Sequence, residues 1–151
     1  MDALDLKIIE TLRGRGRISF SELALNLGLS APSTAERVHR LEEKGIIKGY
    51  KALINEKALG DFFMAFITVS LDRSVYRSNL VEIVKGEPGI LECHHIAGEG
   101  SYLLKTRFKN IDELEHLVNN VLKEIPGVSK TVSTIVLSTI KEEGSDVTPE
   151  R

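Results

Sequence analysis

Residues 28–45 combine a glycine turn with a short cationic helix, and this stretch limits what the chain can fold into. Ser30 is a suitable N-cap, because its hydroxyl can accept a backbone N–H that the first helical turn leaves without a partner. Pro32 then falls in the first turn, where a missing N–H costs little. Gly45 is expected to end the helix. The stretch therefore predicts a helix that starts directly after a tight turn at Gly28.

The predicted helix has one side to be buried and one to be exposed. Leu29, Val38 and Leu41 mark the buried side. The exposed side carries polar and charged residues at three- and four-residue spacing, namely Ser33, Glu36, Arg37, Arg40 and Lys44. Small hydroxyl residues at a helix N-terminus can approach base edges in the major groove of DNA, and the cations beyond them can reach phosphates. The alternative is an ordinary solvated face, since most amphipathic helices carry such residues.

The segments upstream favour DNA binding. Residues 2–13 predict a helix with Asp2 as a possible cap, followed by a short basic loop that contains Arg17. Ser19 and Glu22 form a capping-box pattern, so a second helix is expected to start at Phe20. Two short helices joined by so tight a turn cross at a large angle, as in a helix-turn-helix. The alternative is a three-helix core without a ligand, because helical hairpins with a glycine turn are common.

The charge differs in sign between the two parts of the chain. The whole chain has 151 residues and a net charge of −2. Residues 1–52 hold 9 Lys and Arg against 7 Asp and Glu, a net charge of +2, which leaves 11 against 15, a net charge of −4, for residues 53–151. This asymmetry favours a module that faces nucleic acid, joined to a module with another task.

Composition and cysteine usage indicate a cytoplasmic protein. No apolar run approaches the roughly 20 residues that a membrane-spanning helix needs, and the N-terminus lacks the basic start and apolar core of a secretory signal. Cys93 is the only cysteine, which excludes a disulfide within the chain and fits a reducing compartment. We therefore expect a cytoplasmic location and no membrane partner.

A connector is expected between the two parts. Residues 46–54 are rich in β-branched side chains and predict an extended strand directly after the cationic helix. Asn55 could cap a single turn through Leu59 that ends at Gly60. The predicted organisation is a helix-turn-helix, winged-helix-like domain over residues 1–52, a linker over 53–61, a second domain over 62–141 and a flexible tail over 142–151.

The second domain predicts the order β-α-β-β-α-β, an α+β arrangement. Strands are expected at 62–71, 90–96, 102–108 and 128–140. One helix carries apolar residues from Tyr76 to Val84, and the other is capped by Asn110. The second helix is expected to bury Ile111, Leu114, Leu117, Val118, Val121, Leu122 and Ile125. This order is the split βαβ or ferredoxin-like plan.

The first predicted strand is apolar on both faces, which has a consequence for assembly. Two helices can cover only one face of a four-stranded sheet, so the other face needs a second partner. With one such sheet per chain, the natural partner is another copy of the protein. We therefore expect at least a homodimer, in which paired helices about one DNA turn apart could read a two-fold-related site.

Through residue 141 the chain resembles the Lrp/AsnC family of transcriptional regulators, also called feast/famine regulators. The resemblance rests on Leu4–Ile9, Glu22–Ala24, Gly28–Ser30, Glu36–Val38, Leu41–Tyr50, Gly98–Glu99 and Ile125–Val128. In that family the first half binds DNA, the second half builds dimers and often tetramers of dimers, and small effectors, commonly amino acids, bind between dimers. The resemblance thus implies a cytoplasmic, oligomeric regulator of transcription that binds double-stranded DNA.

The resemblance also implies a candidate effector site, with one departure. Family members typically carry Gly-Asp-x-Asp in the turn between the middle strands, where acidic groups help hold an ammonium. Here the turn reads Gly98-Glu99-Gly100-Ser101, and Ser101 removes the second negative charge. Thr131 and Ser133 match hydroxyl positions that often line the same cleft, and their spacing of two places both on one face of a strand. The alternative is ordinary strand hydroxyls at a subunit contact.

Neither a metal site nor an enzyme is expected. In the run Cys93-His94-His95, neighbours on a strand point to opposite faces, so only Cys93 and His95 could share an ion, and no third ligand is evident. Nothing supplies an oxyanion site beside a nucleophile. Gly98 and Gly100 lack the third glycine and the following helix of a phosphate-binding loop. No cofactor is predicted, apart from a possible amino-acid effector.

Three functions remain open. The leading hypothesis is a sequence-specific regulator in which residues of the cationic helix approach bases while Arg17 and Lys44 bind the DNA backbone. The expected DNA-binding residues are Arg17, Ser30, Ser33, Glu36, Arg37, Arg40 and Lys44. The second hypothesis is an architectural protein that wraps DNA with low sequence preference and without an effector. The third is an amino-acid-binding or metabolic domain that carries a helix-turn-helix.

Overall fold

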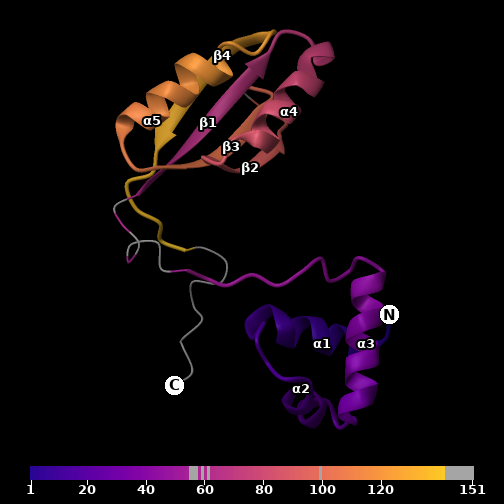
Figure 1. Ribbon diagram of the computed structural model, residues 1–151. Helices are drawn as coiled ribbons and strands as arrows, with labels where there is room; N and C mark the ends of the chain where they lie inside the picture. Colours follow the sequence, from indigo (N-terminus) through magenta and orange to yellow (C-terminus); the bar gives the residue numbers. More distant parts are fainter. Residues whose placement is uncertain (55–57, 59, 61, 99, 142–151) are drawn as a thin grey trace. The chain divides into compact units, whose positions relative to one another are not determined.

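The chain divides into two compact units, one within Met1–Ile54 and one within Asn55–Ile140. The computed structural model describes residues 1–54, 58, 60, 62–98 and 100–141 (Figure 1). The turn expected between Asn55 and Leu59, the side chain of Glu99 and the tail 142–151 lie outside these residues.

The N-terminal unit is a bundle of three helices whose starts are fixed by side-chain caps. These helices are α1 (Ala3–Gly14), α2 (Phe20–Leu27) and α3 (Ala31–Glu43). Asp2 accepts hydrogen bonds from the backbone N–H groups of Leu4 and Asp5, and Ser19 accepts one from Glu22. The Glu22 carboxylate pairs with Arg15 at 2.6 Å instead of returning to its own cap. The expected helix starts are therefore confirmed.

The turn between α2 and α3 gives the helix-turn-helix its shape. Gly28 has φ +67°, a left-handed conformation that L side chains rarely adopt, and its N–H bonds back to α2. Ser30 then caps α3 by accepting the N–H of Ser33 at 3.3 Å. The three helices pack around an almost fully buried core of Ile8, Leu23, Val38 and Leu41.

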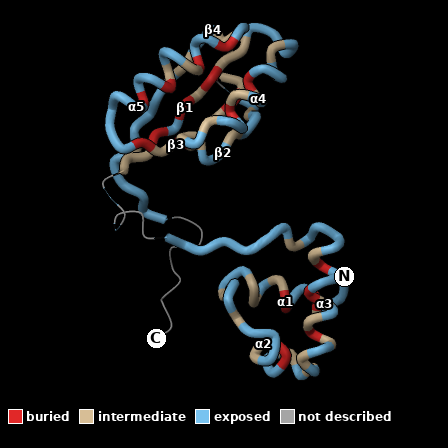
Figure 2. The backbone as a smooth tube through the Cα atoms, in the orientation of Figure 1, coloured by how far each residue is buried: buried red, intermediate tan, exposed pale blue. Residues whose placement is uncertain are grey.

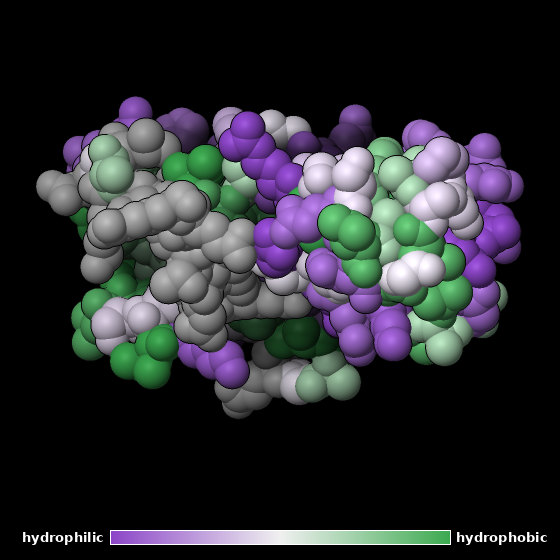
Figure 3. All heavy atoms as spheres, turned by 90° about the horizontal axis from the view of Figure 1, so that it is seen from below, coloured by the Kyte–Doolittle hydropathy of each residue, from purple (hydrophilic) through white to green (hydrophobic). Residues whose placement is uncertain are grey.

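Some apolar side chains remain on the surface. Leu25 of α2 is 81% exposed, and Figure 3 shows hydrophobic patches among hydrophilic surface.

The strand expected over residues 46–54 is absent from the described part of the chain, so that prediction is wrong. The N–H groups of Ile46 and Ile47 both bond to the carbonyl of Leu41, which extends the helix end rather than starting a ladder. Gly49 then has φ +149°, and no described strand pairs with this segment. β-Branched composition gives a strand only where a neighbouring strand accepts its backbone hydrogen bonds.

The C-terminal unit is an antiparallel four-stranded sheet with helices on one face (Figure 1). The strand order is β2-β3-β1-β4, which confirms the ferredoxin-like fold. The elements are β1 (Phe63–Leu71), a 3₁₀ turn η2 (Ser74–Tyr76), α4 (Arg77–Gly86), β2 (Ile90–His95), β3 (Tyr102–Phe108), α5 (Ile111–His116), its π-helical continuation η3 (Leu117–Leu122) and β4 (Val128–Ile135).

The core of this unit lies between the sheet and the helices, where Figure 2 shows buried residues along β1 and the inner sides of α4 and α5. Ala65, Ile67 and Val69 alternate along β1 and are fully buried. Leu80 from α4 and Leu122 from η3 pack against them. The period of two along the strand and the helical spacing of the apolar residues thus meet in one layer.

Two boundaries differ from expectation. β4 ends at Ile135 rather than at residue 140: the N–H of Val136 still bonds to the carbonyl of Met64, but β1 itself starts at Phe63 and offers no partner to the residues that follow. Ile111 was expected inside but is 52% exposed, because it occupies the first position of α5. Both differences occur at the end of a helix or strand, where fewer neighbouring residues are available for packing or pairing.

The face of the sheet away from the helices is only partly covered in the single chain. Ladder partners share a face, so Phe66 lies beside Thr134 of β4 and Lys105 of β3 on this open face. Phe66 is 37% exposed and Val132 44% exposed. None of the described helices has the length and apolar character to cross a membrane.

Candidate nucleic-acid interface

The outer side of α3 presents side chains that the fold does not use. The side chains of Glu36 and Lys44 are exposed and make no hydrogen bond or ion pair within the described residues, and the same holds for the side chain of Arg17 before α2. Ser33 is half-buried at the start of the helix. Arg40 is exposed, with Nη2 3.8 Å from a carboxylate oxygen of Asp5. This surface offers polar groups and cations to a ligand without disturbing the core.

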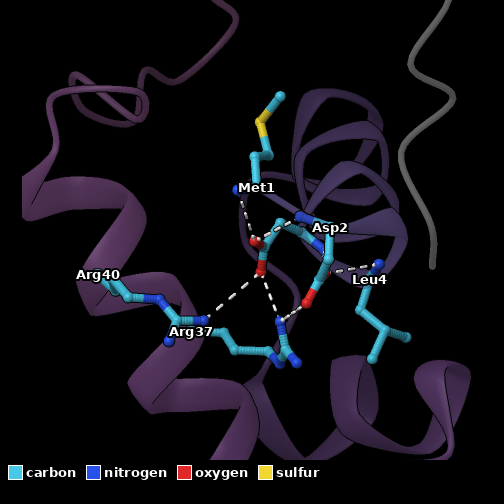
Figure 4. Close-up of polar contacts among 6 residues, drawn as sticks. Met1, Asp2, Leu4, Arg37 and Arg40 are labelled. Atoms are coloured by element: carbon cyan, nitrogen blue, oxygen red, sulfur yellow. Dashed lines mark hydrogen bonds and ion pairs between the residues drawn. The ribbon is translucent and has the colours of Figure 1, made fainter.

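Arg37 differs from its neighbours on α3. Its Nη1 donates to Oδ2 of Asp2 at 2.8 Å and to Oδ1 of Asp5 at 2.7 Å. Figure 4 shows the Arg37 side chain extending from α3 to Asp2 at the start of α1. The Arg37 side chain is only 20% exposed, and Asp5 is buried. The structure therefore connects this predicted DNA-binding residue to α1. Ser30, a further predicted residue, uses its hydroxyl as the cap of α3.

The ionisation of this cluster is shifted in the direction that strengthens it. The backbone N–H of Asp5 and the Arg37 guanidinium lower the pKa of Asp2 to about 2. The backbone N–H of Asp2 and the Arg37 guanidinium also lower the pKa of Asp5, against the effect of its burial. The two carboxylates raise the pKa of Arg37. All three groups are charged at neutral pH.

A second polar cluster lies at the C-terminal end of α3 and was not among the residues predicted from the sequence. Oε1 of Glu42 accepts the hydroxyl of Tyr50 at 2.8 Å, and Oε2 lies 3.1 Å from Nδ1 of His39. The His39 ring meets Phe20 of α2 edge-on, with centroids 6.4 Å apart. Burial and the Glu42 carboxylate raise the pKa of Tyr50 to about 12. The i,i+3 spacing of His39 and Glu42 was the one available signal.

The predicted effector turn folds onto the open face of the sheet at the end of β1. Ser101 donates its N–H to Val69 at 2.9 Å, and its Oγ accepts the N–H of Leu71 at 3.3 Å. Gly100 has φ +84°, and a Cβ at this position would collide with Cγ2 of Thr68. Hydrogen bonds of Ser101 therefore fix the turn to β1, and the missing side chain of Gly100 lets the turn backbone lie close to Thr68. Gly98, the first residue of the turn, is exposed.

Thr131 and Ser133 do not join this turn within one chain. Their ladder partners are Val69 and Ile67, whose side chains are buried under the helices. The two hydroxyl residues therefore share a face, as their spacing predicts, but this is the helix-covered face rather than the face of Thr68 and Gly100.

Two other places hold residue types that bind ligands. Cys93 and His95 share the helix-covered face, where burial raises the Cys93 pKa and His95 packs on Tyr102 with centroids 4.9 Å apart. The residues that the structure describes contain no group of three or more His, Cys, Asp or Glu positioned for a metal ion. A hollow of about 310 Å³ includes Glu87, Arg107 and Glu113 in its lining, but none of the predicted effector residues.

Each of the two units matches a known protein family. Residues 1–48 match the family model described as winged helix-turn-helix DNA-binding, and residues 64–146 match the model described as Lrp/AsnC ligand binding domain. A DNA-reading unit followed by a ligand-binding unit defines the class of transcriptional regulators. Within this class, the chain belongs to the Lrp/AsnC family.

Individual relatives agree over nearly the whole chain. The leucine-responsive regulatory protein of Haemophilus influenzae is 34% identical over 146 residues, which cover 94% of this chain and 87% of that protein. The protein of the same name from Escherichia coli K12 is 36% identical over 145 residues, or 94% of this chain and 88% of that one. A transcriptional regulator from Neisseria meningitidis, solved in complex with L-Met, has a TM-score of 0.87 and 31% identity, covering 99% and 96% of the two chains.

Proposed function

We propose that this regulator reads DNA sequence with the outer side of α3, acts in the cytoplasm as a homodimer or a larger assembly, and responds to an amino acid. The observation that carries the DNA-reading part is the exposed polar and cationic side of α3, with Glu36, Arg40 and Lys44, which follows the tight turn at Gly28. Such a helix is what a helix-turn-helix inserts into the major groove.

The proposed contacts divide into two kinds. Ser33, Glu36 and Arg40 approach base edges, because they lie on the N-terminal and central turns of the exposed side of α3. Arg17 and Lys44 bind phosphates, and the Ser30 hydroxyl can donate to a phosphate while it accepts its capping bond. Base contacts supply discrimination between sequences, whereas phosphate contacts supply affinity.

The proposed homodimer forms through the open face of the sheet. Phe66 and Val132 give this face an apolar centre, while Lys105 and Glu92 lie 3.5 Å apart beside it. A second copy of the same face would cover the apolar side chains that the helices cannot reach. Assembly of dimers into a tetramer of dimers is the further step that the family resemblance suggests.

The proposed effector is an amino acid bound near the turn Gly98–Ser101. Support comes from the match to a ligand-binding domain and from the Neisseria meningitidis relative, whose structure contains L-Met. Ser101 offers a neutral hydroxyl that already accepts the N–H of Leu71, so it can give the ammonium of an effector one further uncharged acceptor but no negative charge. Regulation of this kind involves binding alone and needs neither a catalytic step nor a resident cofactor.

The DNA-reading proposal is tested by comparing preferred and scrambled sequences. A preferred sequence is first selected from a random duplex library, and Kd values for it and for a scrambled duplex are then measured at one fixed salt concentration. A regulator should prefer its selected sequence by about 10³-fold or more. Nearly equal Kd values would instead support the architectural, DNA-wrapping alternative, because phosphate contacts alone barely discriminate.

The effector proposal is tested by thermal shift of the full chain against the twenty amino acids, with Ser101→Asp as companion variant. A wild-type hit that also changes DNA affinity or assembly would support an amino-acid sensor. If no amino acid binds the wild type but the variant gains binding, the missing carboxylate has removed the ammonium site, and effector control of the wild type would be refuted.

A further inference from the structure

We propose that Arg37 is a positioning residue: Asp2 and Asp5 hold it so that the start of α1 sets the orientation in which α3 meets DNA. This inference rests on the proposed DNA-reading function and deepens it, because it assigns specificity to residues outside α3. It also replaces the role that the sequence suggests for Arg37, which is direct contact with DNA.

The cluster joins two carboxylates to several cations (Figure 4): Arg37 bonds to both Asp2 and Asp5, while Arg40 and the backbone amine of Met1 lie 3.8 Å and 4.0 Å from oxygens of Asp5. Arg37 Nη1 reaches both carboxylates at less than 3 Å. The other oxygen of Asp5 accepts the backbone N–H of Asp2 at 3.0 Å, and Asp2 in turn caps α1 through the N–H groups of Leu4 and Asp5. One guanidinium from α3 is therefore connected to the structure that starts α1.

Burial decides between the two roles of Arg37. Asp5 is 5% exposed, so removal of Arg37 would leave a carboxylate shielded from water with its next cation, Arg40, at the longer distance of 3.8 Å. Arg37 would have to leave both carboxylates to bind a phosphate. Lys44 lies further along α3, is exposed, and can bind a phosphate without breaking such a cluster. Arg40 is more exposed than Arg37, at 46% against 20%, and makes only one longer contact with Asp5, at 3.8 Å. Contact with DNA therefore favours Lys44 and Arg40 over Arg37.

The position of the cluster explains why it would affect reading more than folding. Apolar packing of Ile8 against Val38 and Leu41 already holds α1 to α3. Apolar packing is non-directional, whereas the two short hydrogen bonds that the Arg37 guanidinium donates to Asp2 and Asp5 fix a geometry. Without them the N-terminal unit keeps its core, but the rotation of α3 about its own axis loses a restraint. Base contacts need that rotation to be correct, whereas phosphate contacts tolerate small changes.

Two variants of the full chain test the proposal, each with a conservative shape. Arg37→Met keeps a long unbranched side chain and removes the charge. Asp2→Asn removes one carboxylate but keeps a residue that caps helices well, so α1 still starts correctly. Kd values for the preferred and scrambled duplexes are measured over a range of salt concentrations, together with the double variant. Thermal unfolding confirms that each variant is folded at the assay temperature.

The expected result separates positioning from contact. Each single variant should weaken binding to the preferred duplex by about tenfold, with little change for the scrambled duplex and no change in the salt dependence. The double variant should bind about as weakly as Arg37→Met, because both changes remove the same cluster. Lys44→Ala, at a residue proposed to bind a phosphate, serves as the comparison for a contact and should reduce the slope of log K against log salt concentration by about one.

Two results would overturn the inference. If Arg37→Met weakens both duplexes equally and reduces the salt slope by about one, Arg37 binds a phosphate. If Asp2→Asn tightens binding, the carboxylates compete with DNA for Arg37 rather than position it. A wild-type chain that binds both duplexes equally would refute the proposed function and this inference together, and is recognised before any variant is measured.

Discussion

The ring of Tyr76 lies directly against the α-carbon of Gly127, where the chain turns from η3 towards β4. A Cβ on residue 127 would lie 2.5 Å from Cγ and 2.8 Å from Cε2 of the ring, and Gly127 has φ +84°. Both the space and the backbone conformation therefore require glycine. The contact joins the turn before α4 to the last strand of the sheet.

Gly127→Ala should destabilise the C-terminal unit by about 2–3 kcal/mol, since a methyl group would displace the ring and strain the backbone. Gly86→Ala is the matched control, because a Cβ there meets nothing within 4 Å and φ is not in the left-handed region. That change should shift the free energy of unfolding by less than about 1 kcal/mol. Thermal or urea unfolding of both variants measures the difference, and equal effects would contradict the packing argument.

Lys44→Ala should weaken DNA binding on all sequences and reduce the salt slope by about one, because an exposed lysine without a partner in the described structure is free to bind a phosphate. Fluorescence anisotropy at several salt concentrations provides the measurement. Lys7→Ala on α1 is the control for removing one positive charge. An unchanged slope for Lys44→Ala would remove this residue from the proposed interface.

Phe66→Glu should shift the proposed dimer towards monomers, since it places a charge at the centre of the open sheet face. Sedimentation velocity over a concentration series gives the assembly state. Ile111→Glu introduces the same charge at another exposed apolar position, on the helix layer, and should leave assembly unchanged. If both variants, or neither, dissociate, the open face is not the subunit contact.

The cluster at the start of α1 predicts loss of stability in acid. Asp2 has a pKa of about 2 in the folded chain, below the value of 3.8 for an unperturbed Asp. Between these values the unfolded chain binds more protons, so the contribution of Asp2 is present above pH 4 and is lost as the pH falls towards 2. Unfolding of wild type and Asp2→Asn across this range should give curves that converge at low pH. Parallel curves would show that Asp2 does not contribute.

The sequence was most informative where structure depends on near neighbours. Asp2, Ser19 and Ser30 cap their helices as the pattern predicts, since a cap bonds to a backbone group two or three positions along the chain. The β-α-β-β-α-β order followed from changes in apolar periodicity. The same information could not reveal that residues 46–54 pair with no strand in the described part of the chain, or that β4 would end near the point where β1 begins.

The candidate site shows the same division between local and distant information. The spacing of Glu36, Arg40 and Lys44 places them on the exposed side of α3, which a helical period suffices to predict. Arg37 has the same spacing but bonds to Asp5, 32 positions away, so its surroundings depend on the packing of α1. Charge type and helical period alone could not predict that Arg37 is held by two carboxylates while Arg40 is more exposed.

On α3, the residues that pack in the core differ from those that face outward, and this affects how the DNA specificity of such proteins can change in evolution. Glu36 and Lys44 can be exchanged with little effect on the core of Ile8, Val38 and Leu41, because they make no hydrogen bond or ion pair within the described residues. After a gene duplication, one copy could therefore acquire a new set of target sites through a few substitutions on one helix. The scaffold that presents the helix would be inherited unchanged.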